Sequence, residues 1–272
     1  MGGIGIMASF AEGVPCWADA MLPDLEAGKR FYGELFGWTF GTSDERSGRY
    51  TQAYLDGDAV AALFPKTDGR MPTTWGIHLA TPDAAAVARR VREAGGQVIT
   101  GPVPVGDAGV MGQAADPGGA VFGFWQAGEH RGFERQGRPG SYAWTEMYTR
   151  DKEAVDPFYE RVFGYGIHDI DTGDDLDFAT WSPAGEPANE ETAIGGRCVM
   201  DSRFPAEMPP YFLVYFAVAD CDEAVRTVNR LGGRCVFGPM DTPYGRIATV
   251  VDDQGASFAV IALAEPDAGP ET

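Results

Sequence analysis

The sequence predicts an α+β protein of two domains, built from four modules in which one strand, one helix and three strands follow each other (βαβββ). Two internal repeats support this prediction. The segment "RFYGELFGW" at 30–38 returns as "PFYERVFGY" at 157–165, and "AGGQVITGP" at 94–102 returns as "LGGRCVFGP" at 231–239. Such self-similarity indicates one structural unit used twice. Each half divides in two again, because a strand-like run, an Asp and an amphipathic segment occur twice in it.

Each predicted helix begins at an aspartate: Asp24, Asp83, Asp151 and Asp222. An aspartate at this position accepts hydrogen bonds from the free amides of the first turn and complements the helix dipole. In the second helix Val87, Val91 and Ala94 recur at helical spacing and form an apolar stripe that packs on a sheet. Gly95-Gly96 and Gly232-Gly233 end helices because glycine accepts a positive φ.

Short β-rich runs separated by Gly, Pro and Asp follow each helix, among them "RYTQAYL" and "AVFGFWQ". We predict a first domain at 8–127, with modules at about 13–67 and 72–127. A second domain is predicted at 141–265, with modules at about 141–201 and 209–265. The charged, glycine-rich segment 128–140 lacks apolar periodicity and is predicted to be a linker.

Charge and composition limit the partners. Forty acidic residues against 21 basic ones give a net charge of −19, which repels phosphates, so we expect no nucleic-acid partner. The apolar runs are far shorter than the roughly 20 residues that span a bilayer, and the first residues lack the basic region of a signal peptide. We therefore expect no membrane partner and a cytoplasmic location. Four cysteines without a C-x-x-C pair are typical of small buried thiols: Cys16, Cys198, Cys221 and Cys235.

These motifs resemble those of the vicinal oxygen chelate superfamily, the glyoxalase/bleomycin resistance protein/dioxygenase fold, and its tandem two-domain group. The matching features are an Asp followed by Phe-Tyr and an aromatic-Gly exit at 24–38 and 151–165, and Asp-x-x-Gly turns before closing strands at 116–124 and 252–260. The resemblance spans Val14 to about Ala264. It implies that pairs of βαβββ modules form two glyoxalase-like cupped-sheet domains, each around a cavity.

The resemblance also assigns metal-ligand positions to the first strand of a module and to the closing strand. The six positions hold Trp17, Gly76, Gly123, Trp144, Leu213 and Ala259. None of these side chains offers the carboxylate oxygen or imidazole nitrogen that a divalent metal binds. We therefore expect no cofactor, and a divalent metal only at an unconventional site, such as one built on Asp19 and His78.

Four polar residues follow the expected first-strand ligand positions by two residues and therefore lie on the same strand face. They are Asp19, His78, Glu146 and Tyr215. One interpretation is a polar row that orients a ligand, or an acid/base pair such as Asp19 with His78. The alternatives are that these groups satisfy turns and neighbouring strands, or that the predicted face is shifted by one residue.

Aromatic residues are candidates for stacking on a flat hydrophobic ligand, with core packing as the alternative for each. The candidates are Trp17, Tyr54, Trp75, Trp125, Trp144, Tyr148 and Trp181. Trp17 and Trp144 are favoured because they replace metal ligands at equivalent positions. Arg246, in "PYGR", is a candidate partner for an acidic ligand or only part of a hairpin turn.

The sequence therefore favours a metal-free protein, monomeric or homodimeric, that binds a small hydrophobic or aromatic molecule in the cupped-sheet cavity. Drug sequestration in one branch of the family fits this role. The alternative is a glyoxalase-like lyase or isomerase, or a hydroxylase/dioxygenase-type enzyme, that uses Asp19, His78 or Glu146. A third hypothesis is that one domain keeps a site, whereas the other domain has become structural or an interface.

Overall fold

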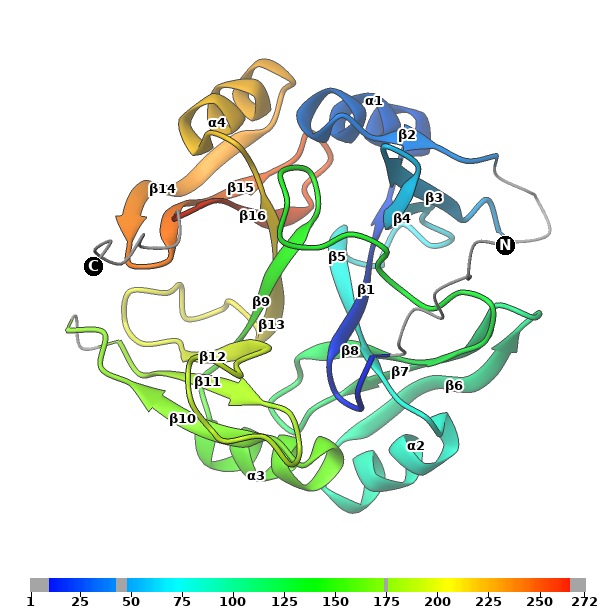
Figure 1. Cartoon of the computed structure of the whole chain (residues 1–272), viewed down its shortest axis with the longest axis vertical. Coiled ribbons are helices and arrows are strands. Elements are labelled where there is room, and N and C mark those ends of the chain that lie inside the picture. Colours follow the sequence, from blue (N-terminus) through cyan, green and yellow to red (C-terminus); the bar gives the residue numbers. More distant parts are fainter. Residues whose placement is uncertain (1–9, 43–47, 174–175, 265–272) are drawn as a thin grey trace, which may run out of the picture. The chain divides into compact units, whose positions relative to one another are not determined.

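The computed structural model describes residues 10–42, 48–173 and 176–264, and these residues follow the four-module plan (Figure 1). The first module contains β1 (Pro15–Leu22), α1 (Leu25–Phe36), β2 (Thr39–Phe40), β3 (Thr51–Leu55) and β4 (Asp58–Pro65). The second contains β5 (Thr74–Ala80), α2 (Ala84–Glu93), β6 (Gln97–Val105), β7 (Gly109–Ala115) and β8 (Val121–Ala127). The third contains β9 (Tyr142–Thr149), α3 (Lys152–Phe163), β10 (Gly166–Ile170), β11 (Phe178–Ser182) and β12 (Gly195–Val199). The fourth contains β13 (Tyr211–Ala217), α4 (Cys221–Arg230), β14 (Arg234–Thr242), β15 (Gly245–Val251) and β16 (Ser257–Leu263).

Strands of two consecutive modules join in one sheet. The first sheet has the order β2-β3-β4-β1-β5-β8-β7-β6, and the second has the order β10-β11-β12-β9-β13-β16-β15-β14. In each module the first strand pairs in parallel with the last, as β1 does with β4 and β9 with β12. These two eight-stranded sheets confirm the predicted α+β fold of two cupped-sheet domains. The predicted outer domain limits at 8 and 265 lie outside the described residues.

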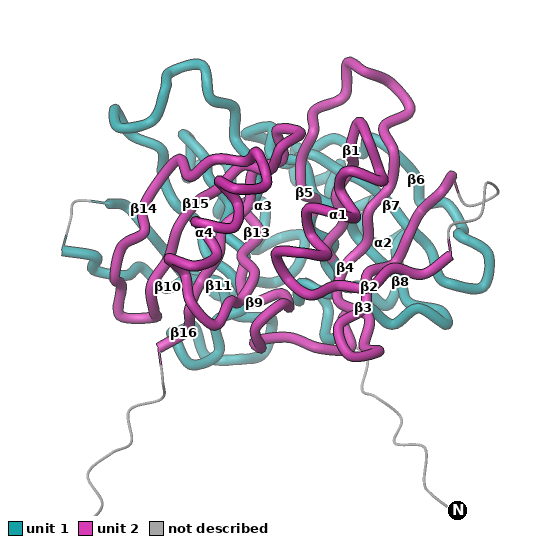
Figure 2. Tube along the Cα trace, turned by 90° about the horizontal axis from the view of Figure 1, so that it is seen from above, with its two compact units in different colours: residues 1–17, 77–132, 145–212 teal, residues 18–76, 133–144, 213–272 magenta. Residues whose placement is uncertain are grey.

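The chain forms two compact units, and each unit contains strands from both sheets (Figure 2). The described residues of unit 1 fall within 1–17, 77–132 and 145–212, and those of unit 2 within 18–76, 133–144 and 213–272. Helix α2 packs against α3 in unit 1, and α1 packs against α4 in unit 2. Strand pairing therefore groups modules one with two and three with four, whereas helix packing groups two with three and one with four.

Three of the four predicted helix starts are confirmed, because Asp24, Asp83 and Asp151 each accept a hydrogen bond from an amide three residues further on. The fourth prediction, Asp222, is wrong by two residues. Helix α4 begins after Asp220, whose carboxylate accepts from the amide of Glu223 at 2.9 Å. A capping side chain accepts from the amide three residues further on. Because the helix starts at Cys221, that residue is Asp220, and Asp222 lies in the first turn.

The Tyr of each repeated Phe-Tyr signature bonds to an Asp-x-x-Gly turn of another module. In unit 2 the Tyr32 hydroxyl donates to Asp252 Oδ2 at 2.7 Å, and in unit 1 the Tyr159 hydroxyl donates to Asp116 Oδ2 at 3.1 Å. The other oxygen of each carboxylate accepts from two amides of its own turn. Burial raises the pKa of both tyrosines and of Asp116. The signature therefore fastens two modules together inside each unit.

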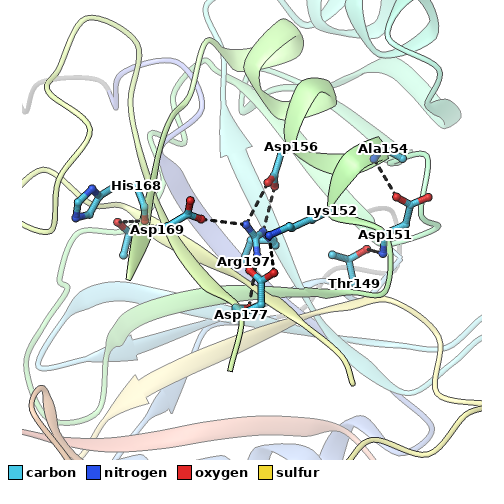
Figure 3. A network of polar contacts seen from close by, with 10 residues as sticks. Thr149, Asp151, Lys152, Ala154, Asp156, His168, Asp169, Asp177 and Arg197 are labelled. Atoms are coloured by element: carbon cyan, nitrogen blue, oxygen red, sulfur yellow. Dashed lines mark hydrogen bonds and ion pairs between the residues drawn. The ribbon is translucent and has the colours of Figure 1, made fainter. Parts of the chain in front are cut away.

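A buried arginine fixes β12 against helix α3 in unit 1 (Figure 3). Arg197 is 1% exposed; its Nη1 lies 2.5 Å from Asp177 Oδ1, and its Nη2 lies 3.1 Å from Asp156 Oδ2. Burial alone lowers the pKa of the guanidinium, but the carboxylates of Asp177 and Asp156 more than offset this and raise it. The next residue, Cys198, points to the opposite face because strand residues alternate.

Candidate ligand-binding site

Glu146 and Tyr148 form a hydrogen-bonded pair on one face of β9 in unit 1. Met147 and Thr149, on the other face, are fully buried, whereas Glu146 and Tyr148 keep partial exposure. The Tyr148 hydroxyl donates to Glu146 Oε2 at 2.9 Å. The two-residue period of the strand therefore places a carboxylate and a phenol side by side.

Tyr211, the first residue of β13, stacks on Tyr148 with ring centroids 4.9 Å apart and planes inclined by only 3°. Phe204, from the loop before β13, lies against Tyr148 with centroids 5.7 Å apart and an angle of 56°. Arg150 holds this loop, because its Nη2 donates to a loop carbonyl at 2.6 Å. Three aromatic rings from two strands and a loop thus gather beside Glu146, and we call these four residues the Glu146 cluster.

Cys198 lies directly across from Tyr148 in the pairing of β12 with β9. Burial raises the pKa of its thiol to about 12, and the negative charge of Glu146 acts in the same direction. Burial also raises the pKa of Tyr211, with smaller contributions from Cys198 and Glu146. Near neutral pH the thiol and the phenol are therefore uncharged, and they act as packing and hydrogen-bonding groups rather than as nucleophiles.

Thiol alkylation tests this electrostatic setting. At about pH 8 iodoacetamide is expected to modify Cys235, which is partly exposed, well before Cys198, because alkylation requires the thiolate and the raised pKa removes it. Peptide mass spectrometry over a time course gives the order. Modification of Cys198 as fast as Cys235 in the folded protein would contradict the assignment.

Asp19 forms a similar pair in unit 2, where the Tyr50 hydroxyl donates to Asp19 Oδ2 at 2.9 Å. Asp19 and Glu146 occupy equivalent positions in β1 and β9, yet their tyrosine partners come from different places. Tyr50 precedes β3, whereas Tyr148 follows Glu146 on the same strand. The predicted polar row therefore includes two separate carboxylate–phenol pairs.

His78 lies over Gly123 in unit 1. The two residues face each other in the pairing of β5 with β8, and a Cβ added to Gly123 would collide with the imidazole of His78. In the second sheet the equivalent residues Tyr215 and Ala259 also face each other, and Tyr215 is 5% exposed. The imidazole therefore fills the space that any side chain at position 123 would need.

Two of the predicted ligand-stacking residues lie in packed surroundings. Trp75 is on the opposite face of β5 from His78, is 2% exposed and donates from Nε1 to the Tyr32 hydroxyl at 2.9 Å. Trp181 is also 2% exposed and stacks on Tyr165. This packing favours the core alternative for both tryptophans.

The remaining predicted residues are spread over both units. Trp17 and Trp125, in unit 1, are buried against the linker residue His130. Trp144, in unit 2, is partly exposed on β9. Tyr54 donates to a side-chain oxygen of Gln52 at 2.6 Å.

Arg246 is the second residue of β15, just after the β14–β15 turn, and its guanidinium binds two aspartates. Its Nε lies 2.6 Å from Asp222 Oδ2, and its Nη1 lies 3.0 Å from Asp241 Oδ1. The hydrogen bonds that the guanidinium donates to these carboxylates raise its pKa. Arg246 therefore has acidic partners inside the chain, which favours the hairpin alternative.

Sequence reasoning missed Tyr211, Phe204, Cys198 and the packing role of His130. Tyr211 could have been found by extending the alternation of Leu213 and Tyr215 back by two residues. No local signal marks Phe204, because its position depends on the fold of the loop before β13.

Several known proteins are similar to this chain. Residues 17–124 match the Glyoxalase/Bleomycin resistance protein/Dioxygenase superfamily. The chain is 37% identical over 275 residues to the anthracycline biosynthesis protein DnrV of Streptomyces peucetius, covering 95% of this chain and 96% of that protein. It is 34% identical over 260 residues to the putative glyoxylase CFP32 of Mycobacterium tuberculosis, covering 93% and 96%.

Solved structures share the fold at low identity. The Mn(II)-bound glyoxalase of Novosphingobium aromaticivorans superposes with a TM-score of 0.65 at 17% identity, over 95% of this chain and 85% of that one. The 2,3-dioxygenase LapB of Pseudomonas sp. KL28 gives a TM-score of 0.62 at 13% identity, over 96% and 97%. These identities are evidence for the fold alone.

The glyoxalase neighbour binds Mn(II), but the residues of this chain do not fit a metal at the positions that the resemblance assigns. The indole nitrogens of Trp17 and Trp144 are donors without a free lone pair, and the place above Gly123 is filled by His78. Within residues 10–42, 48–173 and 176–264, no group of three or more His, Cys, Asp or Glu side chains could hold a metal ion. The same residues contain no helix with the length and apolar character to cross a membrane.

Proposed function

The chain belongs to the glyoxalase/bleomycin resistance protein/dioxygenase superfamily, and from this premise we propose that it binds a planar aromatic small molecule without a metal ion. The proposed site is the Glu146 cluster. The observation that carries the proposal is the parallel pair of Tyr148 and Tyr211, with Phe204 at its side and a carboxylate beside it.

Flat rings are recognised by offset stacking on aromatic side chains, and two tyrosines and a phenylalanine supply such surfaces. Tyr148 and Tyr211 also keep partial exposure, so a ligand ring can reach them. Glu146 can orient the bound ligand, because carboxylate oxygens accept hydrogen bonds from ligand hydroxyl groups. The cluster therefore suits a hydroxylated, fused-ring aromatic compound. The relatives named for anthracycline biosynthesis support this class, since an anthracycline contains fused planar rings.

Binding of emodin, a planar trihydroxyanthraquinone, to the full chain tests this proposal. We expect saturable quenching of the intrinsic fluorescence, and we expect Tyr148→Leu or Tyr211→Leu to weaken binding about tenfold each through loss of a stacking ring. Isothermal titration calorimetry gives the dissociation constants.

Tyr50→Leu is the matched control, because it removes the tyrosine of the other carboxylate–phenol pair. It should leave the affinity within a factor of about two, since that ring is not part of the Glu146 cluster. A panel of fused-ring hydroxyaromatics that shows no saturable binding would overturn the proposal.

A second candidate is acid/base catalysis by Glu146 on a carbonyl substrate, favoured by the hydrogen bond between Glu146 and Tyr148 and by the relatives named putative glyoxylases. In this role the carboxylate removes a proton next to the carbonyl and the phenol steadies the carboxylate. Glu146→Gln separates the two roles. Exchange of a ligand C–H in D₂O, followed by NMR, should stop in this variant while binding persists if catalysis occurs.

A further inference from the structure

The segment 128–132 between β8 and the rest of the linker, here called the strap, is fixed to unit 1 by backbone hydrogen bonds. The amides of Gly128 and His130 donate to the carbonyl of Ala108 at 2.8 and 3.1 Å, and the amide of Glu129 donates to the carbonyl of Asp107 at 2.9 Å. These carbonyls belong to the β6–β7 turn. The part of the predicted linker next to β8 is therefore an ordered element of this unit.

The strap places the imidazole of His130 against two tryptophans of the first sheet. The imidazole centroid is 4.4 Å from that of Trp17 at 84° and 5.6 Å from that of Trp125 at 61°. Trp125 Nε1 also donates to the carbonyl of His130 at 2.9 Å. Trp17 is 3% exposed and Trp125 is 8% exposed.

Gly132 brings the strap close to β1. Its φ is +109°, and a Cβ there would collide with the carbonyl oxygen of Cys16, the neighbour of Trp17. Only glycine fits such a backbone approach without displacement. Two contacts therefore hold the strap over Trp17: the backbone of Gly132 lies close to Cys16, and the imidazole of His130 packs on the indole.

Two of the equivalent positions in the second sheet differ. Trp144, the counterpart of Trp17, stays partly exposed, and Ile261 replaces Trp125. Conversely, the stacked pair Tyr148 and Tyr211 corresponds to Met21 and Thr74 in the first sheet, neither of which is aromatic.

On the basis of the proposed function, we infer that each chain has one ligand site, at the Glu146 cluster. In the first sheet Met21 and Thr74 stand in place of the stacked pair, and the chain's own His130 covers the aromatic residues Trp17 and Trp125. An aromatic ring set edge-on to tryptophan is a favourable contact, so the imidazole covers two tryptophans on which a ligand ring could otherwise stack. The duplicated fold thus keeps one binding site, and the tryptophans of the other sheet are covered by the chain itself.

Titration of the full chain with emodin counts the sites. Calorimetry should give one equivalent of emodin per chain, and the variant Tyr148→Leu/Tyr211→Leu should bind none at concentrations that saturate the parent. His130→Ala is the matched control for the strap and should keep the parent affinity, because the Glu146 cluster does not include it.

Fluorine NMR of protein labelled with fluorotryptophan gives a second readout, in which Trp17→Phe assigns the Trp17 resonance. This resonance should shift in His130→Ala and stay unchanged when emodin is added to the parent. Two equivalents per chain, loss of binding in His130→Ala, or a Trp17 shift on emodin addition would overturn the single-site inference alone. Absence of saturable binding to the parent would overturn the proposed function, and this inference with it.

Discussion

Replacing Arg197 with leucine is expected to lower the free energy of unfolding by about 3 kcal/mol, measured by urea denaturation near pH 7. The change leaves Asp156 half-buried without its cation and removes a partner of Asp177. The estimate is at the lower end of the range for a broken buried ion pair, because both aspartates keep some exposure. Leu63 occupies the equivalent place in β4, so a leucine side chain is compatible with the fold there.

The loss of stability in Arg197→Leu should depend on pH. In the parent the pKa of Asp156 is raised, chiefly by burial, while Lys152 and Arg197 outweigh the burial of Asp177 and lower its pKa. A lowered pKa contributes stability that is present above the ordinary value of 3.8 and lost as the pH falls. Without Arg197 the pKa of Asp156 rises further, which costs stability at neutral pH and less once the carboxyl is protonated. Both effects shrink the difference between parent and variant on acidification.

Lys152→Ala is the control for this prediction, because Lys152 binds the same Asp177 from a more exposed position. A surface ion pair contributes little, so this variant should stay close to the parent. Equal losses for the two variants, or a deficit for Arg197→Leu that does not change with pH, would show that burial of the guanidinium is not what matters.

The fold was accessible from the sequence because its signals are local and repeated. Asp24, Asp83 and Asp151 each mark a helix start through hydrogen bonds that reach only three residues, and the repeat multiplies the evidence. The one error, Asp222 for Asp220, arose where two aspartates compete for the same cap. Helix propensity does not distinguish them, whereas the phase of the buried stripe does.

The candidate site was accessible only in part, because its contacts join distant segments. Glu146 and Tyr148 follow from strand alternation, but the stack of Tyr148 on Tyr211 depends on the neighbouring strand β13. The strap gave no periodic signal, and His130 therefore looked like a linker residue. The packing of Trp17 and Trp125 could not be separated from ligand stacking until the residue that covers them was located.

The two Phe-Tyr signatures look alike in sequence, yet Tyr32→Phe should destabilise the protein by about 2–4 kcal/mol and Tyr159→Phe by about 1–2 kcal/mol. The Tyr32 hydroxyl donates to Asp252 and accepts from Trp75 Nε1, so its removal leaves two buried groups without this partner. The Tyr159 hydroxyl serves only Asp116 among the bonds described. Urea denaturation of the two variants under identical conditions measures the difference.

The pH dependence of Tyr159→Phe distinguishes a lost hydrogen bond from a general packing defect. Burial raises the pKa of Asp116, and the Tyr159 hydroxyl opposes that rise by stabilising the carboxylate. Without the hydroxyl the folded-state pKa rises further above the unfolded value, and such a group stabilises the fold only below its pKa. The cost of Tyr159→Phe should therefore be full at neutral pH and decrease as Asp116 becomes protonated. A cost that is independent of pH, or one that equals that of Tyr32→Phe, would mean that ring packing rather than the tyrosine–aspartate bond joins the modules.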